Sequence, residues 1–330
     1  MPKEHQPHSG SMQFWPRKRA ERQHTPIRAW TTPLGKAGCF AGYKVGMTHL
    51  ILVDSRKTAK TKGMELMTAA TIIECPPMRV IGVRCYGIDK VYAYGERVMT
   101  DIVGKGTPDL SRVFPVTKKE PTQKLAELKA EKYTDIRVLV QTQPAMTSIK
   151  KRPEVFEVGL GGTVAQKLAW AQEKMGKDIF VNDVFAEGQQ VDAHSVTTGR
   201  GLQGPVKRFG VAIRHHKSEK TKRGPGSLGA WKGQGHMMYR VAHAGQTGYH
   251  TRTEWNKWVL KMDTQPKNIN PPDGFKRYGM VKNQYLIVKG SVGGPAKRLI
   301  KLTHPQRPTT RIPSEAPTIR YVSVTTKQGM

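Results

Sequence analysis

The stretch YKVGMTHLILVD, residues 43–54, decides the fold class of this chain. Its β-branched and aromatic side chains favour a strand, and Gly46 suits a bulge or a sharp bend within it. Gly82 and Gly290 suit further bends of the same kind. Five more segments share this composition between glycines and prolines: residues 68–75, 79–86, 136–141, 191–197 and 285–289. We therefore predict a mainly β chain whose strands form a small curved sheet, closed as a barrel.

Helical spacing is found mainly in one segment of nearly balanced charge. Residues 117–190 carry 12 basic and 10 acidic side chains. Leu125 and Leu128 mark a short helix over residues 121–132. Residues 163–175 place several apolar side chains on one helical face, with Gly176 as the stop signal. We predict that this segment is a mixed α/β insertion between strands of the more basic barrel.

The chain as a whole has a large excess of positive charge. Its 55 Lys and Arg against 25 Asp and Glu give a formal net charge of +30. Residues 200–240 concentrate ten basic side chains against the single acid Glu219, and both ends of the chain repeat the bias. Such a charge needs a polyanionic partner to relieve its self-repulsion, and nucleic acid fits best.

Membranes and secretion fit less well. No segment approaches the roughly 18 apolar residues of a spanning helix. The first residues, MPKEHQPHSGSMQF, place charge and histidine where a signal peptide has its apolar region. Three cysteines without a CxxC pair predict reduced, buried thiols in an intracellular protein, not disulfides or a zinc site.

Motifs that would carry enzyme chemistry are incomplete. Gly199, Gly201 and Gly204 match the dinucleotide fingerprint formally, but PVKRFG follows at 205–210 instead of a long helix. The Gly-Lys pairs lack the Ser or Thr of a P-loop, the histidines between 215 and 250 fit no zinc spacing, and no GxSxG elbow occurs. We expect no catalytic residue, no cofactor and no metal.

The stretch KRGPGSLGAWKGQGH, residues 222–236, is the most informative part of the basic region. Its glycines and proline disfavour both helix and strand, so an external partner must hold the backbone. A tryptophan between cations, Trp231, suits stacking on an unpaired base while Lys and Arg neutralise phosphates. The alternative is a disordered loop whose tryptophan packs back on the core.

Seven blocks of sequence together resemble the universal large-subunit ribosomal protein three family (uL3) in its archaeal and eukaryotic form. The blocks follow the family's order along nearly the whole chain. They are HQPHSGSMQFWPRKRA at 5–20, GYKVGMTH at 42–49, ECPPMRVIGV at 74–83, TTGRGLQGPVKRFG at 197–210, RGPGSLGAW at 223–231, AGQTGYHTRTEWN at 244–256 and GSVGGPAKRL at 290–299.

The resemblance implies a six-stranded barrel of the translation-protein type with long, non-globular RNA-binding extensions. It implies a cytoplasmic structural constituent of the large ribosomal subunit that binds its RNA, supports early assembly near the 3′ domain and extends a loop toward the peptidyl transferase centre. Trp231 matches the tip of that loop. Because Ala230 stands where the bacterial branch has a modifiable glutamine, and no counterpart of a modified histidine stands near Lys222, we predict no methylation at the tip.

The expected organisation has five parts. They are a basic N-terminal extension over 1–40, a barrel over 41–90 with 178–200 and 278–305, a near-neutral insertion over 91–177, a central glycine-rich extension over 201–277 and a basic C-terminal segment over 306–330. The residues expected to contact RNA are Arg17, Lys18, Arg19, Arg200, Lys207, Arg208, Arg214, His215, His216, Lys217, Lys220, Lys222, Arg223, Trp231, Lys232, His236, Arg240, His250, Arg252, Lys297 and Arg298.

The expected partners are large-subunit RNA and neighbouring ribosomal proteins, including the uL14 and eL24 families by resemblance. No small-molecule substrate, membrane or second copy of the chain is expected. Two other classes compete with this interpretation. An RNA-modifying enzyme would need a cofactor loop or an acid/base pair, and a DNA-binding protein would usually carry helix-turn-helix signals.

Overall fold

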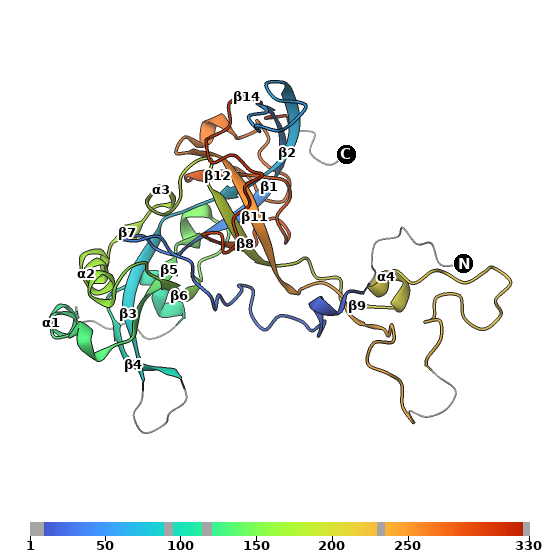
Figure 1. Ribbon diagram of the computed structural model, residues 1–330, viewed down its shortest axis with the longest axis horizontal. Helices are drawn as coiled ribbons and strands as arrows, with labels where there is room; N and C mark the ends of the chain where they lie inside the picture. Colours follow the sequence, from blue (N-terminus) through green and yellow to red (C-terminus); the bar gives the residue numbers. More distant parts are fainter. Residues whose placement is uncertain (1–9, 89–94, 114–120, 230–234, 326–330) are drawn as a thin grey trace. The chain divides into compact units, whose positions relative to one another are not determined.

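The computed structural model describes residues 10–88, 95–113, 121–229 and 235–325, drawn in colour in Figure 1. The chain divides into two compact units. Unit 1 comprises Met1–Gln23 and Val196–Arg252, and unit 2 comprises His24–Ser195 and Thr253–Met330. The described chain is mainly β with several sheets and a smaller helical part, as the sequence predicted.

The larger sheet of unit 2 has seven strands in the order β13-β8-β11-β12-β2-β1-β14, and β13 also pairs with β1. This second pairing makes a closed circuit of six strands, with β14 beside it. The strands are β1 (Cys39–Val53), β2 (Glu65–Glu74), β8 (Gln190–Val196), β11 (Thr251–Asp263), β12 (Tyr285–Lys289), β13 (Leu299–Thr303) and β14 (Ile319–Val322).

The first strand connects the two ends of this circuit. Cys39 to Tyr43 are buried on both faces where β1 pairs with β13, and beyond Gly46 the side chains alternate between buried and exposed. The pairing of β1 with β2 shifts register between Lys44 and Gly46, which is the bulge predicted there. Gly42 is required by close packing, since a Cβ at this position would lie 2.6 Å from the Ile73 Cγ2 atom.

A second sheet of five strands carries the helices of unit 2. Its order is β4-β3-β5-β6, and β7 pairs with β3. The strands are β3 (Met78–Ile88), β4 (Glu96–Val103), β5 (Asp135–Thr142), β6 (Val155–Gly159) and β7 (Asp178–Ile179). The pairing of β3 with β5 shifts register at Gly82, again as predicted. Residues 78–88, which lie in the range expected for the barrel, thus pair in this second sheet.

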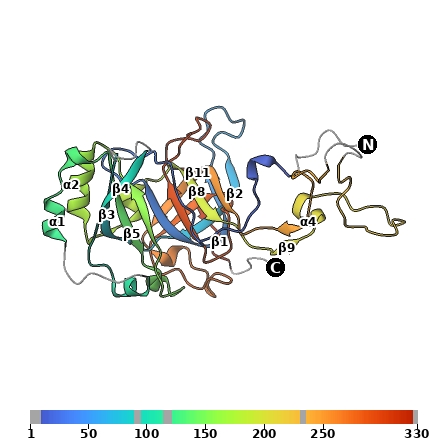
Figure 2. The same ribbon diagram turned by 90° about the horizontal axis from the view of Figure 1, so that it is seen from below.

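Three α-helices lie among the described residues of unit 2: α1 (Thr122–Ala126), α2 (Val164–Lys174) and α3 (Val181–Val184). Thr163 and Gln166 form a capping box at the start of α2, and Gly176 at φ +74° lies just beyond its end. Figures 1 and 2 place α1 and α2 beside β3, β4 and β5, away from β8 and β11. The 3-10 helices η1 to η5 are Met12–Phe14, Pro108–Arg112, Ala130–Lys132, Pro144–Thr147 and Pro266–Asn268.

One hydrophobic cluster joins the two sheets of unit 2. It extends from Phe40, Ile73 and Leu286 of the larger sheet to Val80 and Val138 of the smaller one. The three cysteines are buried and free, as predicted. Burial raises the pKa of the Cys39 thiol to about 12 and that of Cys85 to about 11, so both stay protonated and unreactive.

Unit 1 contains little regular structure. Its two short strands are β9 (Leu202–Gln203) and β10 (Gly245–Gln246), and its one-turn helix is α4 (Pro205–Phe209). The sequence predicted no long helix after Gly204, and Pro205 indeed starts only a single turn. Gly210 at φ +71° ends the turn after five residues, far short of a dinucleotide-binding helix. Residues 210–229 and 235–244 contain no helix or strand.

Candidate nucleic-acid interface

The N-terminal segment and the central segment of unit 1 meet around an aromatic cluster. The Trp15 ring lies 5.8 Å from the Phe209 ring and 5.9 Å from the Tyr239 ring. The Arg17 guanidinium lies 4.2 Å from the centre of the Phe209 ring on α4. Gly10 leaves room for this ring, because a Cβ there would lie 2.9 Å from the Phe209 Cδ1 atom. The cluster joins segments that are far apart in the sequence.

Two of the arginines expected to contact RNA hold this unit together. The Arg208 guanidinium donates from Nε to the Gln246 carbonyl at 3.1 Å and from Nη1 to the His243 carbonyl at 3.0 Å. The Arg17 guanidinium donates to the Arg208 carbonyl. Both side chains therefore connect backbone segments, and each presents only part of its charge to solvent.

Buried His250 also connects the N-terminal segment to the central segment of unit 1. Its side chain is only 8% exposed, and Nδ1 donates to the Lys18 carbonyl at 2.9 Å. Its backbone N–H donates to the Thr197 hydroxyl at 3.1 Å. The Ala20 N–H donates to the Tyr249 carbonyl at 2.8 Å nearby. The structure thus gives His250 a positioning role in the protein, in which it holds the segment with Lys18 and Arg19 in place.

Positive charge in unit 1 is not compensated within the unit. The unit has 16 basic residues and three acidic ones, and among its described residues no cation forms an ion pair with an acid. Burial, followed by repulsion from Arg208 and Arg252, lowers the pKa of Arg17. Burial also lowers the pKa of Arg252, whose guanidinium lies 4.9 Å from the Phe14 ring centre. An anion at this surface would relieve that repulsion.

Most of the other expected RNA-contacting residues are exposed in unit 1. The exposed side chains are Lys18, Arg19, Arg200, Lys207, Arg214, His215, His216, Lys217, Lys220, Lys222, Arg223, His236 and Arg240. The rings of His215 and His216 lie 4.0 Å apart. Trp231 and Lys232 lie outside the described residues.

Two expected RNA-contacting residues lie in unit 2. Lys297 is exposed with φ +70°, and its N–H donates to the Lys44 carbonyl at 2.7 Å. Arg298 is half-buried beside it. Both cations lie in the turn between β12 and β13.

Part of the glycine-rich stretch is held by a single arginine. The Arg214 N–H donates to the Lys222 carbonyl at 3.0 Å, and its Nη2 donates to the Pro225 carbonyl at 2.9 Å. These bonds close a loop of basic residues whose side chains remain in solvent. These hydrogen bonds therefore fix the base of the loop, although residues 210–229 form no helix or strand.

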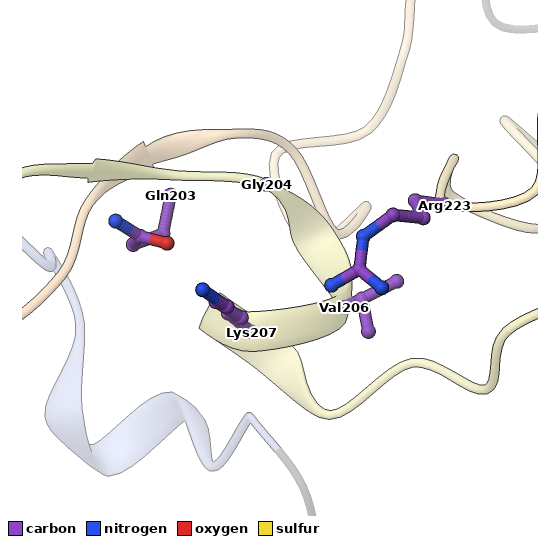
Figure 3. Close-up of a pocket in the computed structure, with 5 residues that line it drawn as sticks. All are labelled: Gln203, Gly204, Val206, Lys207 and Arg223. Atoms are coloured by element: carbon purple, nitrogen blue, oxygen red, sulfur yellow. The ribbon is translucent and has the colours of Figure 1, made fainter.

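A hollow of about 170 Å³ lies beside α4 in unit 1. Gln203, Gly204, Val206, Lys207 and Arg223 line it. Figure 3 shows the Lys207 ammonium pointing toward the Gln203 amide, and the Arg223 guanidinium on the Val206 side of the same hollow. Two cations that line one hollow offer charge-assisted hydrogen bonds to a phosphate group. The sequence analysis did not single out Gln203, because a single glutamine forms no recognisable binding motif.

The described residues contain neither a candidate metal cluster nor a candidate membrane-spanning helix. No group of three His, Cys, Asp or Glu side chains among them is placed to hold a metal ion. Within the same part of the chain, no helix is long and apolar enough to cross a membrane. The exposed cations of unit 1 can bind and position anions.

Comparison with known proteins gives a consistent match over the full length. The family model described as Ribosomal protein L3 matches residues 1–329. A protein named large ribosomal subunit protein uL3 from Methanosphaera stadtmanae is 45% identical over 343 aligned positions, covering 100% of both chains. Those of the same name from Methanothermobacter thermautotrophicus and Archaeoglobus fulgidus are each 42% identical, with 100% and 99% of both chains covered.

Proposed function

The chain belongs to the ribosomal protein L3 family, and we propose that it binds large-subunit ribosomal RNA chiefly through unit 1. The family consists of structural ribosomal proteins and not of enzymes, and its members are components of the large subunit in the cytoplasm. The observation that carries the proposal is the uncompensated charge of unit 1, with its mutually repelling arginines and its exposed cations. Ribosomal RNA supplies the missing negative charge as a dense array of phosphates.

The roles of individual residues in this proposal follow from their contacts. Lys207 and Arg223 bind one phosphate in the hollow beside α4, while Arg17, Arg208 and His250 hold the two segments together. The other exposed cations neutralise phosphates around them and carry little sequence information. Binding should thus be strongly salt-dependent and tolerant of the RNA sequence.

We also propose the more detailed roles that the resemblance to the uL3 family implies. The closed circuit of six strands in unit 2 is then the translation-protein-type barrel that anchors the extensions. Residues 222–236 extend toward the peptidyl transferase centre with Trp231 at the tip, and the chain supports early assembly near the 3′ domain. Proteins of the uL14 and eL24 families are its proposed neighbours.

The first test is sedimentation of cell extract through sucrose gradients at low and high salt, with a nuclease-treated sample in parallel. The chain should migrate with large subunits, resist moderate salt and be released by nuclease. Migration as free protein at low salt would refute the assignment to the subunit.

The second test addresses the phosphate hollow. The full chain is titrated with protein-free large-subunit RNA across a series of KCl concentrations, as wild type and as the Lys207→Ala/Arg223→Ala double variant. Loss of two phosphate contacts should make the plot of log K against log salt shallower by about 1.5. Lys129→Ala/Lys132→Ala, on the near-neutral segment, is the matched control and should leave the slope unchanged. An unaltered slope in the first variant would remove the hollow from the interface.

A further inference from the structure

A second concentration of positive charge lies on unit 2, in the turn between β1 and β2. Residues 54–64 carry four basic side chains and one acid, Asp54. Unit 2 as a whole has 39 basic and 22 acidic residues, of which the near-neutral segment 117–190 accounts for a net +2. Most of the excess charge of unit 2 thus lies outside that segment, and this turn is one of its densest parts.

Asp54, the single acidic residue of the turn, organises the turn through its carboxylate. The buried Asp54 carboxylate accepts bonds from the Arg56 N–H at 3.1 Å, Nε at 2.9 Å and Nη2 at 2.8 Å, and from the Thr61 hydroxyl at 2.6 Å. Two backbone hydrogen bonds join the ends of the turn: the Gly63 N–H donates to the Asp54 carbonyl at 2.9 Å, and the Asp54 N–H donates to the Met64 carbonyl at 3.0 Å. These bonds hold the pKa of the Asp54 carboxyl well below its usual range. The turn is therefore ordered by contacts within the chain.

Three lysines of the turn take no part in this network. Lys57, Lys60 and Lys62 are exposed, and no acidic partner lies within 4 Å of any of them among the described residues. Asp54 is already satisfied by Arg56 and Thr61, so it does not neutralise them. The folded turn thus presents three unpaired ammonium groups on a rigid support at the end of a long hairpin.

We propose that Lys57, Lys60 and Lys62 form a second RNA contact, which binds the phosphate backbone of a ribosomal RNA segment separately from unit 1. The inference rests on the proposed RNA binding of the chain. Lysine ammonium groups on flexible stems act as point charges that suit phosphates without demanding one geometry. A protein partner fits less well, because the centres of protein interfaces are depleted in lysine and enriched in aromatic residues and arginine.

The contact is tested with the full chain and protein-free large-subunit RNA across a series of KCl concentrations. Lys57→Ala/Lys60→Ala/Lys62→Ala leaves Asp54, Arg56 and Thr61 in place, so the turn keeps its fold. The plot of log K against log salt should become shallower by about 2. The control Lys124→Ala/Lys129→Ala/Lys132→Ala removes the same charge from exposed positions of the near-neutral segment and should keep the wild-type slope.

The outcomes separate this inference from the proposed function. A wild-type slope in the turn variant, with a reduced slope in Lys207→Ala/Arg223→Ala, would overturn the second contact and leave RNA binding by unit 1 intact. Failure of the wild-type chain to bind the RNA would overturn both. If the turn variant lost binding to polyglutamate and kept its RNA slope, the turn would belong to an acidic protein partner and the RNA assignment would be wrong.

A second measurement locates the contact directly. Acetylation of Lys57, Lys60 and Lys62 by a water-soluble ester, read by mass spectrometry, should fall several-fold when the RNA is added and recover after nuclease treatment. Lys129 should remain equally reactive throughout. Unchanged acetylation of the three lysines in the complex would refute the proposal even where the slope had moved.

Discussion

Replacing Phe209 by alanine should open unit 1 without unfolding unit 2. The Phe209 ring is only 9% exposed and contacts both Trp15 and the Arg17 guanidinium, so it joins the N-terminal segment to α4. Truncation of a buried phenylalanine costs about 3 to 5 kcal/mol, and we expect the lower figure in so small a cluster. A loss of about 3 kcal/mol corresponds to roughly a hundredfold rise in the population of the open form.

Hydrogen exchange measures this opening at individual amides. The Ala20 N–H, which donates to the Tyr249 carbonyl, reports on attachment of the N-terminal segment and should exchange about a hundredfold faster in Phe209→Ala. Amides of β1 in unit 2 should not change. Leu202→Ala is the matched control, because this side chain is 76% exposed in the same unit and its loss should cost less than about 0.5 kcal/mol.

Unaltered exchange at Ala20 in Phe209→Ala would show that the aromatic cluster does not hold the segments together. RNA binding gives an independent readout of the same variant. The loosened unit must be ordered again when RNA binds, so affinity should fall while the salt slope stays that of the wild type, because no cation has been removed. A shallower slope would contradict this separation of roles.

Three further predictions follow from other residues. Burial lowers the pKa of His304 to about 4, below its ordinary value of 6.5, so folding favours the neutral imidazole. This contribution to the free energy of unfolding is fully present above pH 6.5. The free energy of unfolding should therefore fall by about 2 kcal/mol between pH 7 and pH 5. Urea unfolding at both pH values should show a smaller drop in His304→Gln, and an equal drop would refute the assignment. Glu74→Gln should lower the free energy of unfolding by about 2 kcal/mol. The buried Glu74 carboxylate accepts hydrogen bonds from the Lys282 and Asn283 N–H groups, both at 2.9 Å, and a glutamine amide can accept fewer of the hydrogen bonds that are donated there. An unchanged urea midpoint would contradict this prediction. Trp231→Ala should still enter large subunits in sucrose gradients but impair translation at the peptidyl transferase centre, and normal translation with full incorporation would argue against a functional tip.

Local pattern predicted six strands and the longest helix of the described chain. All six predicted strands are present, with Gly46 and Gly82 at shifts of register, and Thr163 to Gly176 bound the predicted helix. These signals depend on side-chain alternation, caps and backbone freedom, which act over a few residues. By contrast, β11 was missed although it is long, because TRTEWNKWVLKMD mixes charges with apolar residues and shows little alternation.

We inferred from the sequence alone that the chain is strongly basic, that one segment is near-neutral, that the cysteines are buried and that the chain resembles the uL3 family. The tertiary structure was needed to show how distant segments meet: it shows that β13 pairs with both β8 and β1, and that residues 10–23 pack on residues 196–252. It also decided that Arg17, Arg208 and His250 connect backbone segments, and that Lys57, Lys60 and Lys62 remain unpaired beside a satisfied Asp54. Composition counts charges, whereas the role of each charge depends on which partners the fold brings within reach of a hydrogen bond.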